Sequence, residues 1–170
     1  MGRSSSCYFK GRLLKVYTKR VRLPNGFVAD IDVVKHIGAV LVVPFLSKDK
    51  VVFIRQYRPV IKEYLYELPA GTLSKKESLV NCAQRELVEE TGFSAKMIKH
   101  LGAIVPVPGY STEKIEIFKA EKLTKVGRQS EKDEVIEVTV FTSAEVKKLF
   151  RLGQLVDAKT ICALAKVGWL

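Results

Sequence analysis

The sequence predicts an α+β fold in which a mixed β-sheet is covered by helices. Most of the chain consists of short runs rich in Val, Ile, Phe and Tyr, separated by turn residues, as strands are. Helical periodicity appears once in the middle of the chain, near residues 77–91, and twice at its end. The length of 170 residues and the apolar fraction of 47% fit a globular domain with a substantial core.

The first elements form a hairpin. The runs 13–23 and 27–34 flank the tripeptide at 24–26, Pro-Asn-Gly, and Asn-Gly is a strong hairpin signal because it accepts positive φ. We therefore expect residues 1–35 to form an N-terminal antiparallel β-hairpin region, with the main domain at 36–170.

A second hairpin, a short strand and the central helix follow. The β-branched runs 38–45 and 50–59 flank a polar turn, and the run 63–71 ends in a turn at Pro69-Ala70-Gly71. The helix at about 77–91 stops at Gly92, a residue suited to the left-handed end of a helix. The remaining elements are expected as strands at 94–107, 113–123 and 133–141 and helices near 143–151 and 157–167, the last with Asp157 as N-cap and Gly168 as stop.

The central helix carries glutamates where its periodicity calls for apolar side chains. At about 100° per residue, Glu86 and Glu90 fall near the centre of the core-facing stripe and Glu89 near its edge. An inward carboxylate is costly unless a positive charge meets it. The apolar members of the stripe are expected to be Leu79, Cys82, Ala83 and Leu87.

Charge and cysteine usage narrow the class of protein. The net charge of +11 favours anionic partners, but the lysines and arginines are scattered, which suits solubility or a phosphate-bearing small molecule better than a nucleic acid. The longest apolar run, 37–46, is too short to span a bilayer, and no signal peptide is visible. Cys7, Cys82 and Cys162 lack metal-binding or redox spacing, so we expect reduced, buried thiols in a cytoplasmic protein.

One segment carries a specific signature. Gly71, Glu77 and the run Arg85-Glu86-Leu87-Val88-Glu89-Glu90-Thr91-Gly92-Phe93 occupy every specified position of a pattern over residues 71–93, and through it the sequence resembles the Nudix hydrolases. The resemblance implies an α/β/α sandwich with a mixed sheet. It also implies hydrolysis of a nucleoside diphosphate linked to another group, with Mg²⁺ or Mn²⁺ held by glutamates of the helix.

The resemblance assigns roles that agree with the chemistry of oxygen ligands. Glu86, Glu89 and Glu90 are expected to bind the metal, together with the carbonyl of Ala70, because Mg²⁺ prefers carboxylate, carbonyl and water oxygens. Glu86 and Glu90, four residues apart, share one helical face. Arg85 and Glu77 are expected to orient those glutamates, whereas His36 and His100 are expected to be structural.

Beyond the signature, the chain resembles the ADP-ribose pyrophosphatase branch. The resemblance rests on Pro108 with the following "GYSTEKIEIF", on the segment 55–71 and on the tail 155–168. It implies cleavage of ADP-ribose to AMP and ribose 5-phosphate, with a nucleotide sugar or a dinucleotide as alternative substrates. Arg58, or else Arg55, would contact phosphate. Glu113 would either accept hydrogen bonds from the terminal ribose or be an exposed strand residue. Four tyrosines would either stack on adenine or pack in the core: Tyr57, Tyr64, Tyr66 and Tyr110.

An acidic loop is expected to supply the general base. The branch often carries Glu-x-Glu before its late strand, whereas this chain reads Glu131-Lys132-Asp133-Glu134, with lysine at the first of the two places. Glu134 is our choice as general base or extra metal ligand, with Glu131 as the alternative.

Relatives of the branch are commonly intertwined homodimers, which implies that residues 1–35 cross to a partner. Two other functions stay open: a Nudix enzyme acting on RNA 5′ ends, suggested by the positive charge, and a non-catalytic ligand-sensing module. The intact signature favours catalysis on a small molecule, without nucleic acid or membrane partners.

Overall fold

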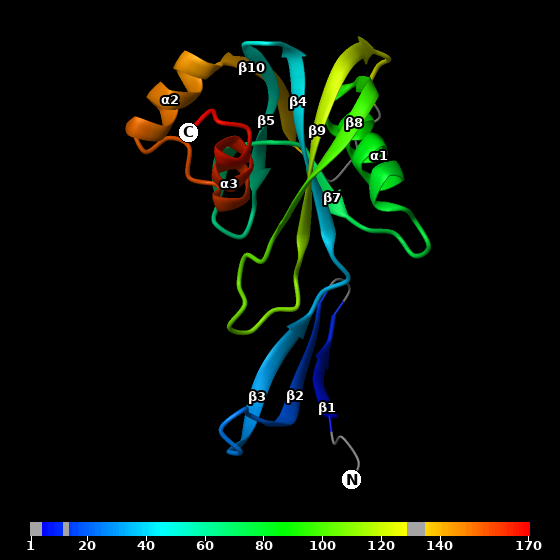
Figure 1. Ribbon diagram of the computed structural model, residues 1–170, viewed down its shortest axis with the longest axis vertical. Helices are drawn as coiled ribbons and strands as arrows, with labels where there is room; N and C mark the ends of the chain where they lie inside the picture. Colours follow the sequence, from blue (N-terminus) through cyan, green and yellow to red (C-terminus); the bar gives the residue numbers. More distant parts are fainter. Residues whose placement is uncertain (1–4, 12–13, 129–134) are drawn as a thin grey trace. The chain divides into compact units, whose positions relative to one another are not determined.

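The computed structural model describes residues 5–11, 14–128 and 135–170 (Figure 1). The chain forms two compact units, one of residues 1–38 and 105–114 and the other of residues 39–104 and 115–170. The first unit therefore contains a loop from the middle of the chain, which the sequence did not assign to it.

The first unit is built on an antiparallel sheet in the order β1-β2-β3. Strands β2 (Lys15–Arg22) and β3 (Val28–Lys35) form the predicted hairpin, and β1 (Ser5–Lys10), which was not predicted, pairs with β2. In the turn, Gly26 takes a positive φ of 85° whereas Asn25 does not. The Asn25 side chain instead accepts a hydrogen bond from the Phe27 backbone N–H at 3.0 Å.

The second unit holds a mixed sheet, as predicted. Its strand order is β10-β5-β4-β9-β8, with β6 paired to β5 and β7 paired to β4. Strands β4 and β9 run parallel and the other pairs are antiparallel. The strands are β4 (Ala39–Ser47), β5 (Lys50–Arg58), β6 (Glu63–Glu67), β7 (Ala70–Thr72), β8 (Phe93–Ile104), β9 (Ile115–Lys125) and β10 (Ile136–Thr142).

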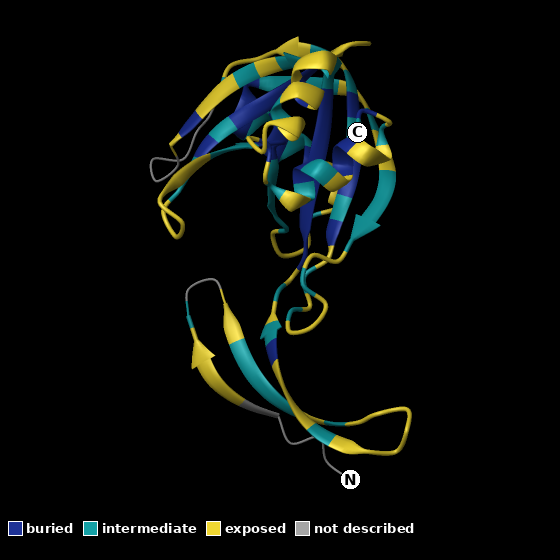
Figure 2. Cartoon of the chain, turned by 90° about the vertical axis from the view of Figure 1, so that its left-hand side faces the viewer, coloured by how far each residue is buried: buried dark blue, intermediate teal, exposed yellow. Residues whose placement is uncertain are grey.

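Helices cover both faces of this sheet (Figures 1 and 2). Successive residues of β4 alternate between the two faces. Val40 and Val42 pack in one core with Ala83 of α1 (Leu79–Thr91), and Leu41 and Val43 pack in the other with residues of α2 (Ser143–Arg151) and α3 (Ala158–Lys166). The second unit is thus the predicted sandwich of helices around a sheet.

Three details of the prediction were wrong. The expected turn at Pro69-Ala70-Gly71 is largely strand β7, because this segment pairs with β4 and the Pro69 carbonyl accepts the Val42 N–H at 2.9 Å. Leu79 is 36% exposed, since it is the first residue of α1. All three cysteines are free, as expected, but Cys82 alone is buried, whereas Cys7 and Cys162 are exposed.

No helix in the described part of the chain is long and apolar enough to cross a membrane.

Candidate active site

Two caps fix the start, the end and the rotation of helix α1. The Ser78 side chain accepts a hydrogen bond from the Asn81 N–H at 3.2 Å, as an N-cap does. Gly92 ends the helix in the left-handed conformation with φ 75°, and its N–H donates to the Val88 carbonyl. In this rotation Glu86 and Glu90 are only 8% and 4% exposed, as the periodicity predicted.

Strand β7 lies directly against these two carboxylates. A Cβ added to Gly71 would lie 2.0 Å from Cδ of Glu86, so only glycine leaves room for that carboxylate. The Ala70 N–H donates to Oε2 of Glu90 at 2.9 Å. Because N–H and C=O of a strand residue point to the same edge, the Ala70 carbonyl faces the same edge as its N–H. The structure therefore brings together three of the predicted metal ligands, Ala70, Glu86 and Glu90.

Arg85 holds the acidic residues of the signature in place. Its Nε donates to Glu77 at 2.9 Å, and its Nη1 contacts both Glu86 at 2.7 Å and Glu89 at 2.8 Å. The hydrogen bond from Arg85 lowers the pKa of Glu77 from 4.5 to about 2. The predicted bracing role of Arg85 and Glu77 thus corresponds to an ion-pair network that reaches two of the helix glutamates.

The thiol of Cys82, which lies next to Arg85, is unreactive at neutral pH. Cys82 is buried, and Nη2 of Arg85 lies 3.4 Å from its sulfur. Burial, followed by the negative charge of Glu77, raises the pKa of Cys82 to about 12. A thiol with so high a pKa remains protonated at neutral pH and is no nucleophile.

Arg58 forms a fork-shaped ion pair with a buried carboxylate. Its Nε and Nη2 donate to the two oxygens of Glu67 at 2.7 and 2.6 Å. Hydrogen bonding to Glu67 raises the pKa of Arg58 against the opposing effect of burial, and the charges of Glu67, Asp157 and Glu90 add to the rise. Arg58 is therefore close enough to Glu90 for their charges to interact.

Glu67 is the residue of this network that the sequence analysis missed. It is 1% exposed, and burial alone would raise its pKa. Hydrogen bonds and charge from Arg58 and Lys159 more than offset this effect, so its pKa lies below the ordinary range. Lys159 of α3 also contacts Asp157 at 2.9 Å. The signal in the sequence was an acidic residue within an apolar strand next to Leu68-Pro69, which calls for a cationic partner.

The other candidate phosphate ligand, Arg55, lies on the opposite face of β5. Its Nη1 contacts Glu137 at 3.2 Å, and its guanidinium lies 4.1 Å from the centre of the Tyr64 ring. Tyr64 also packs against Tyr57, and Tyr66 packs against Phe141 in the core under α2 and α3.

The remaining candidates belong to the first unit or lie outside the described residues. Glu113 has an oxygen 3.8 Å from Nδ1 of His36, and Tyr110 is 58% exposed. His36 and His100 have the structural partners expected of them: Nδ1 of His36 accepts the Gly38 N–H, and Nε2 of His100 lies 2.6 Å from Glu116. Glu131 and Glu134 lie outside the described residues.

Comparison with known proteins decides the family. The model of the NUDIX domain matches residues 35–164. The chain belongs to the Nudix family. This Nudix protein is 35% identical over 158 residues to the ADP-ribose pyrophosphatase of Bacillus subtilis, covering 92% of this chain and 85% of that one. It is 32% identical over 158 residues, with the same coverage, to the methanol dehydrogenase activator of Bacillus methanolicus.

A solved structure confirms the fold. The crystal structure of an ADP compounds hydrolase superposes with a TM-score of 0.85 at 24% sequence identity, covering 96% of this chain and 89% of the other. The correspondence therefore includes the α/β/α arrangement of this Nudix protein.

Nudix hydrolases generally need divalent metals, and the site has the chemistry for one. Its donors are carboxylate and backbone oxygens, which suit a hard cation. Gly71 leaves space for the carboxylate of Glu86, and Glu90 is fixed by the Ala70 N–H. In the described residues no three His, Cys, Asp or Glu side chains stand at metal-binding spacing. Arg85 contacts both Glu86 and Glu89, so the carboxylates of α1 and the Ala70 carbonyl form one group of oxygen donors.

Proposed function

We propose that this Nudix protein hydrolyses ADP-ribose to AMP and ribose 5-phosphate with the help of Mg²⁺. One observation carries the proposal: two buried carboxylates, Glu86 and Glu90, lie against Gly71 and Ala70 within an intact Nudix signature. The choice of substrate is supported by the similarity to an ADP-ribose pyrophosphatase over most of both chains.

The metal would be held by Glu86, Glu90 and the Ala70 carbonyl, with Glu89 as a further oxygen donor. Bound there, a divalent cation offsets the charge of the diphosphate and lowers the pKa of a nearby water. Mn²⁺ is the alternative to Mg²⁺, because both accept oxygen ligands. Arg85 keeps the carboxylates in position, since it contacts Glu86 and Glu89 at once.

Arg58 is the better placed of the two candidate phosphate ligands. Two of its five N–H donors are used by Glu67, and its side chain is 39% exposed. Its outer donors thus remain available to phosphate oxygens, near Glu90. Arg55 would act in the same way only if its contacts with Glu137 and Tyr64 were given up. Glu113 is proposed to accept hydrogen bonds from the ribose hydroxyls.

Glu134 is proposed as the general base that accepts a proton from the attacking water. The glutamates of α1 suit this role less well, because metal binding and Arg85 engage their oxygens. Glu131 is the alternative in the same loop.

We also propose that the protein is a homodimer. The sheet β1-β2-β3 and the turn between β2 and β3 expose large apolar side chains, among them Tyr8 at 70%, Phe27 at 65% and Ile31 at 41%. A sheet exposed to this degree gains stability when a second surface covers it, and a second copy of residues 1–35 offers a matching one. Light scattering on the full chain and on a chain lacking residues 1–35 tests this: the full chain should have twice the mass of its monomer, and the shortened chain should be monomeric.

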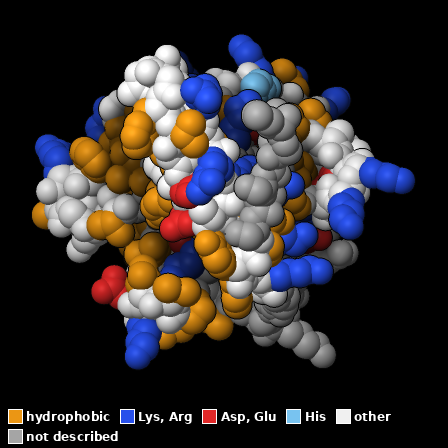
Figure 3. Space-filling model, turned by 90° about the horizontal axis from the view of Figure 1, so that it is seen from below, with side chains coloured by type: hydrophobic (Ala, Val, Ile, Leu, Met, Phe, Trp, Pro, Cys, Tyr) orange, Lys and Arg blue, Asp and Glu red, His pale blue; other side chains and the backbone are white. Residues whose placement is uncertain are grey.

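We propose that the positive charge serves a small anionic substrate and not a nucleic acid. On the face drawn in Figure 3, lysine and arginine side chains are spread among hydrophobic and neutral ones and form no continuous stripe. Sequence-independent binding of nucleic acids requires such a track of charge. The charge is better explained by solubility and by attraction of small anionic substrates.

The test is a substrate panel assayed with Mg²⁺ and with the products identified. It contains ADP-ribose, a nucleotide sugar, a dinucleotide, a nucleoside triphosphate and 5′-triphosphorylated RNA. We expect kcat/KM for ADP-ribose to exceed that for any nucleoside triphosphate by at least about tenfold. A preference for the triphosphate or the RNA would refute the proposal. A preference for the nucleotide sugar or the dinucleotide would show that the group linked to the nucleoside diphosphate is not the ribose of ADP-ribose.

A further inference from the structure

A hollow lies where the central sheet of the second unit divides. Strands β4 and β9 pair in parallel from Ala39 and Ile115 as far as Pro44 and Ala120. Beyond this point β4 continues on β5 and β9 continues on β8, so the two strands separate (Figure 1). A crevice at the carboxyl ends of parallel strands, where their connections leave in opposite directions, is a preferred ligand position in open sheets.

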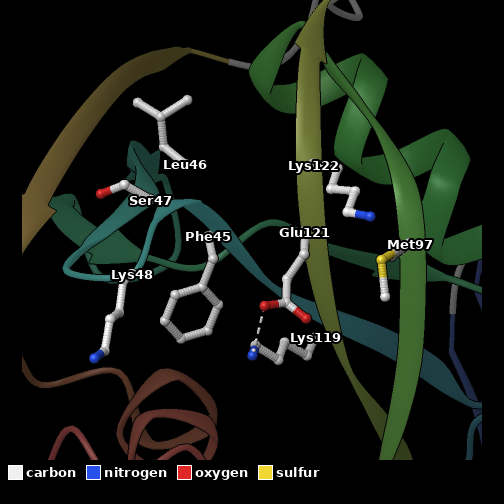
Figure 4. A pocket seen from close by; sticks show the side chains of 8 residues that line it. All are labelled: Phe45, Leu46, Ser47, Lys48, Met97, Lys119, Glu121 and Lys122. Carbon is white, nitrogen blue, oxygen red and sulfur yellow. Dashed lines mark ion pairs between the residues drawn. The ribbon is translucent and has the colours of Figure 1, made fainter.

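The hollow has a volume of about 560 Å³, within the range of small-molecule sites. We call it the lysine hollow and define it by Phe45, Lys48, Met97, Lys119, Glu121 and Lys122, which line it (Figure 4). Figure 4 shows these side chains arranged around it on the β4–β5 hairpin, on β8 and on β9, with Lys48 and Lys122 at opposite ends.

Its charge is positive. Lys119 contacts Glu121 at 2.8 Å, and its Nζ lies 4.8 Å from the centre of the Phe45 ring. Among the described residues, Lys48 and Lys122 have no acidic partner within ion-pair distance. Two cations therefore remain uncompensated beside one neutral pair, so the hollow as a whole favours an anionic ligand.

The backbone of Lys122 is unusual as well. Its φ is +56°, a conformation that residues other than glycine seldom adopt, although β9 continues to Lys125. Such conformations are found preferentially at functional sites, where a side chain must point in a particular direction.

The lysine hollow is separate from the active site. Lys119 pairs with Val43, which belongs to the core under α2 and α3, so its side chain lies on that face of the sheet. Glu86 and Glu90 belong to α1, which packs on the other face. A ligand in the lysine hollow would therefore not touch the signature glutamates.

The apolar part of the lining completes the argument. Phe45 and Met97 add nonpolar surface to the lining of the hollow. We propose that the lysine hollow binds a nucleoside phosphate, with the charges of Lys48 and Lys122 attracting the phosphate and with Phe45 and Met97 contacting the base or sugar. This site is additional to the catalytic one. The proposal does not depend on which substrate the catalytic site hydrolyses.

The protein contains a natural reporter for this site. Trp169 is the sole tryptophan, and it packs edge-on against Phe45 with ring centres 5.5 Å apart. The experiment is a titration of the full chain, without added divalent metal, with AMP, ribose 5-phosphate and adenosine while Trp169 fluorescence is recorded. We expect a saturable change with AMP, a weaker one with ribose 5-phosphate, and none with adenosine.

Variants make the test specific. Lys48→Ala and Lys122→Gly should each raise the Kd for AMP at least about fivefold, while kcat/KM of the enzyme for its substrate stays within about twofold. Lys62→Gly is the matched control, because Lys62 has almost the same backbone conformation, with φ 58°, and does not line the hollow; its Kd should be unchanged. The proposal is overturned by an equal response to adenosine, by an unchanged Kd in both Lys48→Ala and Lys122→Gly, or by no saturable response to AMP up to about 10 mM.

Discussion

The missing side chain of Gly71 and the carboxylate of Glu86 occupy the same space. A Cβ at residue 71 would lie 2.0 Å from Cδ and Oε1 of Glu86 and 2.3 Å from Oε2. Strand β7 and helix α1 can therefore approach each other only because residue 71 is glycine. This contact explains why the signature joins a glycine to a glutamate fifteen positions later in the sequence.

Gly71→Ala should damage activity far more than stability. The atoms that a methyl group would meet belong to the flexible end of Glu86, so the carboxylate can move aside at small cost. Moving it by an ångström would misplace a group needed for catalysis, and we expect kcat/KM to fall by about 10²-fold or more. Kinetics and thermal unfolding of the same preparation measure both effects. Gly109→Ala controls for stability, since a Cβ at residue 109 would meet nothing within 4 Å. A variant with normal kcat/KM would show that the position of Glu86 does not matter.

Acid should weaken the ion pair between Glu77 and Arg85. The pKa of Glu77 is lowered to about 2, chiefly by the hydrogen bond from Arg85, so the pair contributes stability above the unfolded-state pKa of about 4.5. That contribution is lost as the pH falls from about 5 to 2. Urea unfolding measured at several pH values in this range gives the free energy of unfolding. It should fall less with decreasing pH in Glu77→Gln than in the wild type. Glu63→Gln, which removes an exposed carboxylate, should behave as the wild type does. Parallel curves for the wild type and Glu77→Gln would contradict the assignment.

Arg58→Lys should affect both stability and substrate binding. Lysine keeps the charge but loses the fork that holds both oxygens of Glu67, a carboxylate that is 1% exposed. We expect a loss of about 1–3 kcal/mol in the free energy of unfolding, and a rise in KM of about tenfold or more.

Arg20→Lys is the matched control for that variant. Arg20 makes the same fork to Asp30 at 2.9 and 2.7 Å, but both side chains are largely exposed. Its unfolding midpoint and KM should hardly change. Equal effects in the two variants would show that burial of Glu67 is not the cause.

Glu134→Gln should lower kcat by about 10²-fold or more with little change in KM, because the general base would lose its ability to accept a proton. Glu131→Gln should have a much smaller effect. Steady-state kinetics from pH 6 to 9 decide between the two residues. Our assignment is wrong if the Glu134 variant keeps its full kcat or if the Glu131 variant is the more impaired.

Local signals predicted much of this structure. The β-branched runs and the turn residues predicted the strands of the second unit other than β7, and the phase of α1 correctly placed Glu86 and Glu90 on its buried face. Leu79 was misjudged because periodicity takes no account of helix ends, where the next turn is missing.

Long-range pairing explains what the sequence analysis did not find. Residues 69–71 read as a turn, but pairing with β4 makes residues 70–72 strand β7 and turns the Ala70 N–H toward Glu90. Glu67 and Lys159 are 92 positions apart, and nothing local connects them. The sequence could show that Glu67 needed a cation, but the fold was needed to show which cations meet it.

Metal-dependent hydrolysis at Glu90 is tested most directly by a phosphorus NMR spectrum of ADP-ribose incubated with Mg²⁺ and either the wild type or Glu90→Gln. Glu90→Gln keeps the shape of the side chain and an acceptor for the Ala70 N–H but removes the charge proposed to hold the cation. The wild type should replace the diphosphate signals with those of two phosphomonoesters, AMP and ribose 5-phosphate, and a chelator should stop the reaction. Glu90→Gln should remain folded and leave the diphosphate intact over the same time. An intact diphosphate with the folded wild-type protein, or equal cleavage by the two proteins, would contradict hydrolysis by a cation held at Glu90.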